Sequence, residues 1–163
     1  MRLAAAAPLA FTAAVLLAFT ATARADGIQT VSGQTVYVPV YSHIWHGNLD
    51  AKGKPQTLLL SSMLSVRNTD ANSGLTVTSI RYYDTGGQLL REYVQTPNKL
   101  GPLASSDVFV EHKDDKGGNG ANFMVEWKAD KPISPPVIET VNAYFFGPHS
   151  LAFTSPGRAV SEK

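Results

Sequence analysis

Short stretches in which apolar and polar residues alternate dominate the chain after its first thirty positions. In residues 122–129, for example, Phe123, Val125 and Trp127 alternate with more polar neighbours. A period of two places successive side chains on opposite faces of a β-strand. Gly, Pro, Asn and Asp interrupt these stretches, and no long segment shows the apolar spacing of a helix. The pattern predicts an all-β protein.

The alternating stretches predict seven or eight short strands without an internal repeat. This number and the turn residues between them favour an immunoglobulin-like antiparallel β-sandwich with Greek-key connections. A small closed β-barrel is the alternative fold. The expected strands are residues 34–41, 57–68, 75–84, 88–94, 106–111, 122–129, 137–146 and 150–154.

Three local features refine this prediction. The run Asp84-Thr85-Gly86-Gly87 supplies the backbone conformations of a tight hairpin between two antiparallel strands. A change of alternation phase near Ser79 indicates a β-bulge. Pro39 lacks an N–H donor, which favours an edge position for the first strand, so that this strand could accept a strand of a partner.

The N-terminus has the features of a secretory signal. Arg2 precedes an uncharged Ala- and Leu-rich run, and Ala23-Arg24-Ala25 fits signal peptidase cleavage. We therefore expect a cleaved signal peptide at residues 1–25, a lead-in at 26–35, one β-sandwich domain at 36–154 and a flexible tail at 155–163. We expect a periplasmic or secreted protein without a stable membrane span after cleavage, because no second long apolar run follows.

Composition narrows the possible chemistry. The chain has no cysteine, which excludes disulfides, thiolate nucleophiles and Cys-ligated zinc. Without Arg2 and Arg24, the 14 Lys and Arg residues become 12, against 13 acidic residues. No cluster of basic residues is present, so nucleic acid is not an expected partner.

Histidines give the strongest hint of a metal site. His43 and His46 lie three residues apart just after the first expected strand, and a turn there would let both imidazoles bind copper or zinc. His112 and His149 are candidates to complete such a site. Ordinary polar loop histidines are the competing interpretation, since a spacing of three on a strand separates the side chains.

Other motifs do not support catalysis. Asp84-Thr85-Gly86 resembles the tripeptide of aspartic proteases, but it occurs once, whereas that chemistry needs two carboxylates. The loop at residues 114–122 is rich in Asp, Asn and Gly yet matches no calcium motif, and turn residues explain it. No serine lies in a Gly-x-Ser-x-Gly elbow. The sequence therefore favours a protein that is not an enzyme and has no cofactor apart from the possible metal.

Several segments resemble a bacterial exported family known as domain of unknown function 3124. The resemblance spans about Val36 to Phe153 and implies an exported single-domain protein without implying an activity. It rests on residues 38–44 (VPVYSHI), 64–68 (LSVRN), 82–84 (YYD), 102–106 (PLASS) and 120–127 (GANFMVEW).

Together these features predict an exported binding module of the cell envelope. Its partner would be an envelope protein or a small ligand, and the loops at one end of the sandwich would provide the contacts. A periplasmic copper- or zinc-binding protein using His43 and His46 is the alternative. The candidate binding surface consists of Tyr41, Trp45, Asp114, Asn119 and Asn122.

Overall fold

The computed structural model describes residues 29–162. The predicted signal peptide lies outside this range. The described residues form twelve β-strands and no helix, and seven of the strands (β1, β4, β5 and β8–β11) have six residues or more. The strands are β1 (Val31–Pro39), β2 (His43–His46), β3 (Gln56–Leu59), β4 (Ser61–Arg67), β5 (Leu75–Tyr83), β6 (Leu89–Glu92), β7 (Asn98–Leu100), β8 (Ser105–Val110), β9 (Asn122–Ile133), β10 (Val137–Phe146), β11 (His149–Pro156) and β12 (Arg158–Glu162).

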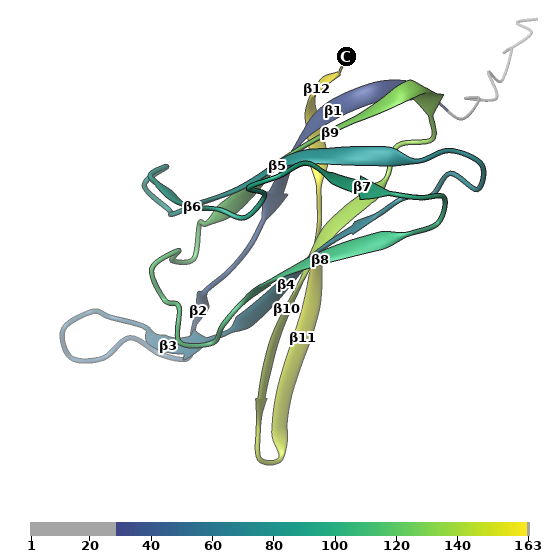
Figure 1. Cartoon of the computed structure of the whole chain (residues 1–163). Helices are drawn as coiled ribbons and strands as arrows, with labels where there is room; N and C mark the ends of the chain where they lie inside the picture. The colour runs from purple at the N-terminus through teal and green to yellow at the C-terminus, as the bar shows by residue number, and fades with distance from the viewer. Residues whose placement is uncertain (1–28, 163) are drawn as a thin grey trace, which may run out of the picture.

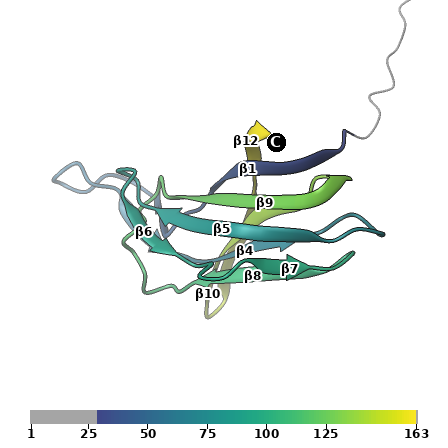
Figure 2. The ribbon, with the colours of Figure 1, turned by 45° about the horizontal axis from the view of Figure 1, so that its top comes forward.

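The strands form three antiparallel sheets (Figure 1). The largest has the order β12-β1-β9-β5-β6, with β7 also paired to β5. Figure 2 shows β1, β9 and β5 side by side in this sheet. The second sheet has the order β11-β10-β4-β8, and β2 and β3 form a separate two-stranded sheet. Each of the two larger sheets ends in edge strands, so the molecule is not the closed barrel considered as the alternative fold.

Both larger sheets contribute to one hydrophobic core. Trp127 and Phe123 of β9 and Tyr82 of β5 are its largest fully buried side chains. Leu64 and Val66 of β4, in the other sheet, belong to the same cluster. The alternation seen in the sequence therefore marks the faces that the two sheets bury against each other.

The predicted hairpin and bulge are both confirmed. β5 and β6 pair antiparallel across the turn, where Gly87 has a φ of 79° and its N–H donates to the carbonyl of Asp84. The register between β5 and β9 shifts between Val77 and Ser79, which leaves Thr78 as the extra residue. The phase change in the sequence therefore has its cause in this bulge.

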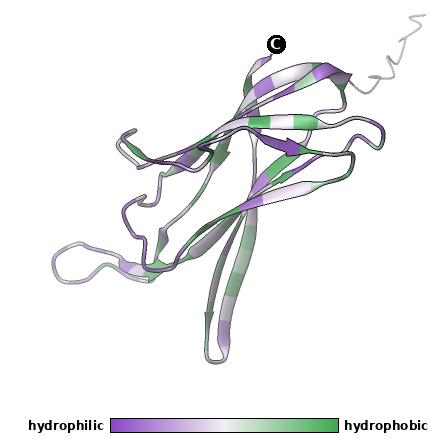
Figure 3. Ribbon diagram, in the orientation of Figure 1, coloured by the Kyte–Doolittle hydropathy of each residue, from purple (hydrophilic) through white to green (hydrophobic). Residues whose placement is uncertain are grey.

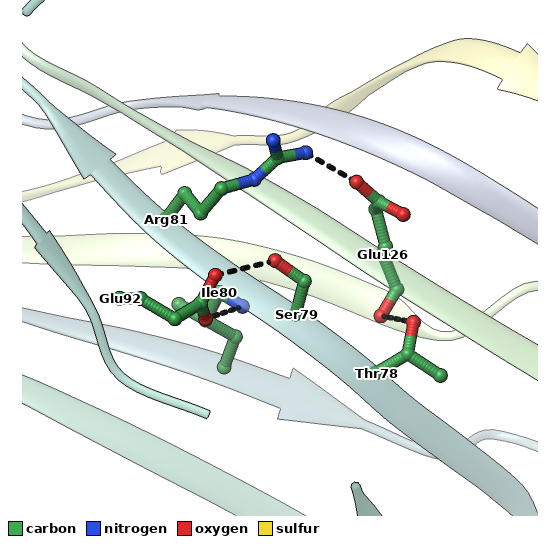
Figure 4. Close-up of polar contacts among 6 residues, drawn as sticks. All are labelled: Thr78, Ser79, Ile80, Arg81, Glu92 and Glu126. Carbon is green, nitrogen blue, oxygen red and sulfur yellow. Dashed lines mark hydrogen bonds and ion pairs between the residues drawn. The ribbon is translucent and has the colours of Figure 1, made fainter. Parts of the chain in front are cut away.

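Side chains satisfy the backbone groups around the bulge (Figure 4). The Thr78 hydroxyl donates to the carbonyl of Glu126 at 3.1 Å. Glu92, on the neighbouring strand β6, accepts from the Ile80 N–H at 2.9 Å and from the Ser79 hydroxyl at 2.8 Å. Arg81 forms an ion pair with Glu126 on the other side of β5. Polar groups from three strands thus hold the irregular register in place.

The first strand is not an edge strand, contrary to the sequence prediction. β1 pairs with β9 on one side and with β12 on the other, where Gln34 is opposite Glu162 and Tyr37 is opposite Arg158. Pro39 lies beyond the last residue that β12 pairs, so its missing N–H interrupts no bond to that strand. Val38 is fully buried, which removes it from any exposed surface.

The described residues end in a strand where the sequence predicts a flexible tail. Residues 158–162 form β12, and residues 31–35, expected as lead-in, belong to β1. Between β11 and β12 the chain crosses from one large sheet to the other at Gly157, whose N–H donates to the Ile138 carbonyl at 2.8 Å. A Cβ at this position would lie 2.7 Å from that carbonyl oxygen and 2.7 Å from Val36 Cγ1. The crossing therefore favours glycine, because any larger residue would force these neighbours to shift.

Candidate binding site

The β10–β11 hairpin extends beyond the sheet that contains it. β4 pairs with β10 only up to Ala143, whereas β10 and β11 continue to pair with each other up to Phe146 and His149. We call residues 144–151 the arm; it projects from the body of the molecule in Figure 1. Phe145 is 75% exposed and Phe146 is 72% exposed, and Figure 3 shows apolar residues along this hairpin. The arm thus presents large apolar groups to solvent.

A second two-stranded hairpin carries Trp45 and two of the histidines. Trp45, a residue of the candidate binding surface, is 60% exposed on β2. β2 and β3 pair without a register shift from His43 to His46. The two histidines are therefore part of a regular strand, which directs their side chains to opposite faces. The turn that would let both rings bind one metal ion is not present.

Of the other two histidines, His149 lies in the arm and His112 lies near it. His149 begins β11 opposite Phe146, and the ring of His112 lies 6.4 Å from the ring of Tyr144. In the part of the chain that the structure describes, no three His, Asp or Glu side chains gather in a group that could hold a metal ion. His43 and His46 are thus not joined by the candidate ligands His112 and His149.

Tyr41, another residue of the candidate surface, is held in place by contacts within the protein. Its ring packs edge-on against Phe153, with centroids 5.5 Å apart. Its N–H donates to the buried Asn142 Oδ1 at 3.1 Å, and the Ser62 hydroxyl donates to its carbonyl. These contacts fix the chain between β1 and β2 against β4, β10 and β11 of the second sheet.

The glycine-rich loop between β8 and β9 is held on two sides. The Ser42 hydroxyl accepts from the Gly118 N–H at 2.8 Å, and the Thr85 hydroxyl accepts from the Gly120 N–H at 2.9 Å. The Thr85 N–H also donates to the Gly117 carbonyl at 2.8 Å. Asn119 lies half-buried between these two contacts, and Asn122 begins β9 opposite both Pro39 and Tyr83. The loop that the sequence analysis explains by its turn residues therefore has a defined conformation.

Asp114 and Tyr82 line a cavity of 330 Å³ beside this loop. Arg91 of β6 and Glu111, Lys113 and Lys116 of the loop also line it. A further cavity of 250 Å³ shares Arg91, Glu111 and Asp114. The site thus joins the end of β5, strand β6 and the loop after β8.

Two polar atoms of this site are buried without a hydrogen-bond partner among the residues that the structure describes. They are the hydroxyl oxygen of Tyr82, a residue that is 1% exposed, and Oδ1 of Asp114. A buried polar group without a partner costs about 1–3 kcal/mol relative to one that is satisfied. Burial raises the pKa of the Tyr82 hydroxyl, and the negative charge of Asp114 raises it further. Tyr82 therefore stays a neutral hydrogen-bond donor at physiological pH.

Glycine at position 117 allows Tyr82 to occupy this place. A Cβ on Gly117 would lie 1.9 Å from the Tyr82 hydroxyl oxygen. Asp114 was recognisable in the sequence as a loop residue, but its relation to Tyr82 and Arg91 was not. Tyr82 on β5 and Arg91 on β6 come to lie beside the loop only in the folded protein. No local sequence pattern predicts such a cavity.

Comparisons with known proteins give one informative match. The family model described as "Protein of unknown function (DUF3124)" matches residues 33–160, which confirms the resemblance seen in the sequence. A search of curated proteins finds no significant match. The solved structure "Crystal Structure of Thermotoga maritima 1070" is 11% identical, with a TM-score of 0.43, and the similarity covers 80% of this chain and 97% of that chain. This last similarity is too low to support an argument about fold or function.

Proposed function

Because the chain belongs to the family described as protein of unknown function DUF3124, we propose its role from its own geometry: it is a non-enzymatic binding module of the cell envelope. In this proposal the arm docks on a partner protein. The exposure of Phe145 and Phe146 on a hairpin that extends past its sheet carries the proposal.

Exposed phenylalanines on an isolated hairpin are unfavourable for the free protein. A two-stranded ribbon has little stability by itself, and exposure of large apolar side chains to water is unfavourable. Burial of one phenylalanine in a partner would contribute about 1.5–3 kcal/mol. Successive residues of a strand face opposite sides, so Phe145 and Phe146 would contact two different parts of a partner.

The backbone of the arm also supports docking by strand addition. Tyr144 to Phe146 pair only with β11, because β4 ends opposite Ala143. Among residues 29–162, no strand therefore pairs with the outer edge of β10 along the arm, and β11 is itself an edge strand. A partner strand could pair with either edge while the phenylalanines enter its pockets. This replaces β1, which is internal, as the edge proposed for a partner.

Two further elements of the proposal concern fold and location. The paths β1-β9-β5 and β11-β10-β4 have the order of immunoglobulin strands B-E-D and G-F-C, which supports an immunoglobulin-like sandwich. β8 departs from that fold, since it joins β4 although it follows β5 in the chain.

The N-terminal pattern supports export to the periplasm or the medium. The described residues contain no apolar helix of membrane-spanning length.

Site-specific photo-crosslinking in the native host tests the arm. A photoreactive residue at Phe146 should give a discrete adduct with another protein, whereas the same residue at Leu89, which is 54% exposed on β6, should not. The Phe145→Ser/Phe146→Ser variant should fold normally and lose the partner in co-purification. An unchanged set of partners would contradict the proposal, and so would adducts that contain lipid instead of protein.

A further inference from the structure

We propose that the cavity between Tyr82, Arg91 and Asp114 binds a small zwitterion of the amino-acid class, a molecule with an ammonium group and a carboxylate. The site is separate from the arm and does not depend on it. The argument starts from the unpartnered groups in the wall of the cavity. Asp114 Oδ1 only accepts hydrogen bonds when ionised, so the missing partner must be a donor.

An ammonium group is the donor that fits the carboxylates. Asp114 and Glu111 both line the cavity and give it two negative charges. Rotation of the Asp114 carboxylate about its last bond would turn Oδ1 toward an ammonium group in the cavity. A hydrogen bond between two ions is stronger than one between neutral groups. The neutral Tyr82 hydroxyl lies in the same wall and would be satisfied by the rearranged carboxylate or by the ligand.

The cations of the site require an anionic group on the same ligand. Arg91, Lys113 and Lys116 line the cavity together with the two acids. The Arg91 guanidinium lies 5.3 Å from the centre of the Tyr93 ring, which holds it over an aromatic face. An amine without a carboxylate would be repelled by these three cations, and an anion without an amine would be repelled by the carboxylates of Asp114 and Glu111. A zwitterion satisfies both sets of charges.

The site is prepared for binding before any ligand arrives. Ser42 holds the loop at Gly118 and Thr85 holds it at Gly120, and Gly117 has no side chain that would displace the Tyr82 hydroxyl. The volume of 330 Å³ accommodates a molecule of amino-acid size. Preorganised walls lower the entropy cost of binding.

Calorimetric titration of the purified protein tests this proposal. The probes are L-alanine and two molecules that each keep one of its charged groups, ethylamine and propionate. L-leucine and L-glutamine extend the test to larger side chains. We expect binding of at least one amino acid and much weaker binding of ethylamine and propionate.

Asp114→Asn should weaken amino-acid binding at least tenfold, whereas its neighbour Asp115→Asn should leave binding unchanged, because Asp115 does not line the cavity. Arg91→Gln should weaken binding as well. Tyr82→Phe should weaken binding without lowering the thermal midpoint of the free protein, since it removes an unpartnered hydroxyl. This separates a binding role from a structural one.

Three results would overturn the proposal. They are no binding of any amino acid at millimolar concentration, equal binding of propionate or ethylamine, and unchanged affinity of a folded Asp114→Asn variant. The crosslinking result at the arm is independent of all three, so failure of one proposal is distinguishable from failure of the other.

Discussion

At the scale of single residues, Glu92 shows how one side chain stabilises an irregular strand. Its carboxylate accepts from the N–H groups of Ile80 and Val94 and from the hydroxyl of Ser79. Partial burial acts to raise the pKa of Glu92, but these hydrogen bonds and the charge of Arg81 outweigh it, so that the pKa lies below its usual range. The ionised form is therefore the one that the folded state prefers.

This preference predicts pH-dependent stability. A carboxyl group with a lowered pKa stabilises the fold above the pKa of the unfolded chain and loses this effect as the pH falls toward the folded value. Glu92→Gln should lower the free energy of unfolding by about 1 kcal/mol at pH 7, allowing for the partial exposure of this side chain. The difference from wild type should shrink below the ordinary glutamate pKa of about 4.3 in urea denaturation. Glu139→Gln in β10 is the control, and a difference for Glu92→Gln that is constant with pH would contradict this account.

At the scale of secondary-structure elements, the crossing from β11 to β12 depends on Gly157. Gly157→Ala should destabilise the protein by about 1–3 kcal/mol, because the added methyl group would overlap Val36 Cγ1 and the Ile138 carbonyl. Gly101→Ala is the matched control, since a Cβ there meets nothing within 4 Å and should change stability by less than about 0.5 kcal/mol. Chemical denaturation measures both variants. Equal stability of the two would show that the crossing has room to relax.

The elements that the sequence predicted are those with a buried face. Phe123, Val125 and Trp127 alternate because β9 packs on the core, and the glycines after Asp84 mark a turn for local steric reasons. β12 was predicted as a tail because all five of its side chains are exposed, so no alternation marks it as a strand. β1 was predicted as an edge strand because Pro39 disfavours an internal position. No pattern in the sequence predicts β12, the strand that pairs with β1.

At the scale of the whole molecule, the candidate sites depend on contacts between distant segments. Tyr82, Arg91 and Asp114 are core, strand and loop residues by their sequence patterns, and only the arrangement of β5, β6 and the loop after β8 places them around one cavity. The arm resulted from unequal strand lengths, because β10 and β11 continue beyond the end of β4. A single strand pattern predicts the length of one strand but not where its neighbour stops.

The connection at Gly157 joins the two large sheets, because β11 belongs to one sheet and β12 to the other. Truncation after Gly157 removes β12 and leaves Gln34 to Tyr37 of β1 without a partner on that side. The core should remain, because all side chains of β12 are exposed and its removal uncovers few apolar groups. Hydrogen exchange should therefore show lost protection at Gln34 to Tyr37 and retained protection in β9 and β10. Unchanged protection in β1 would mean that β12 does not pair with it in solution, and global loss of protection would mean that the linkage between the sheets is essential for folding.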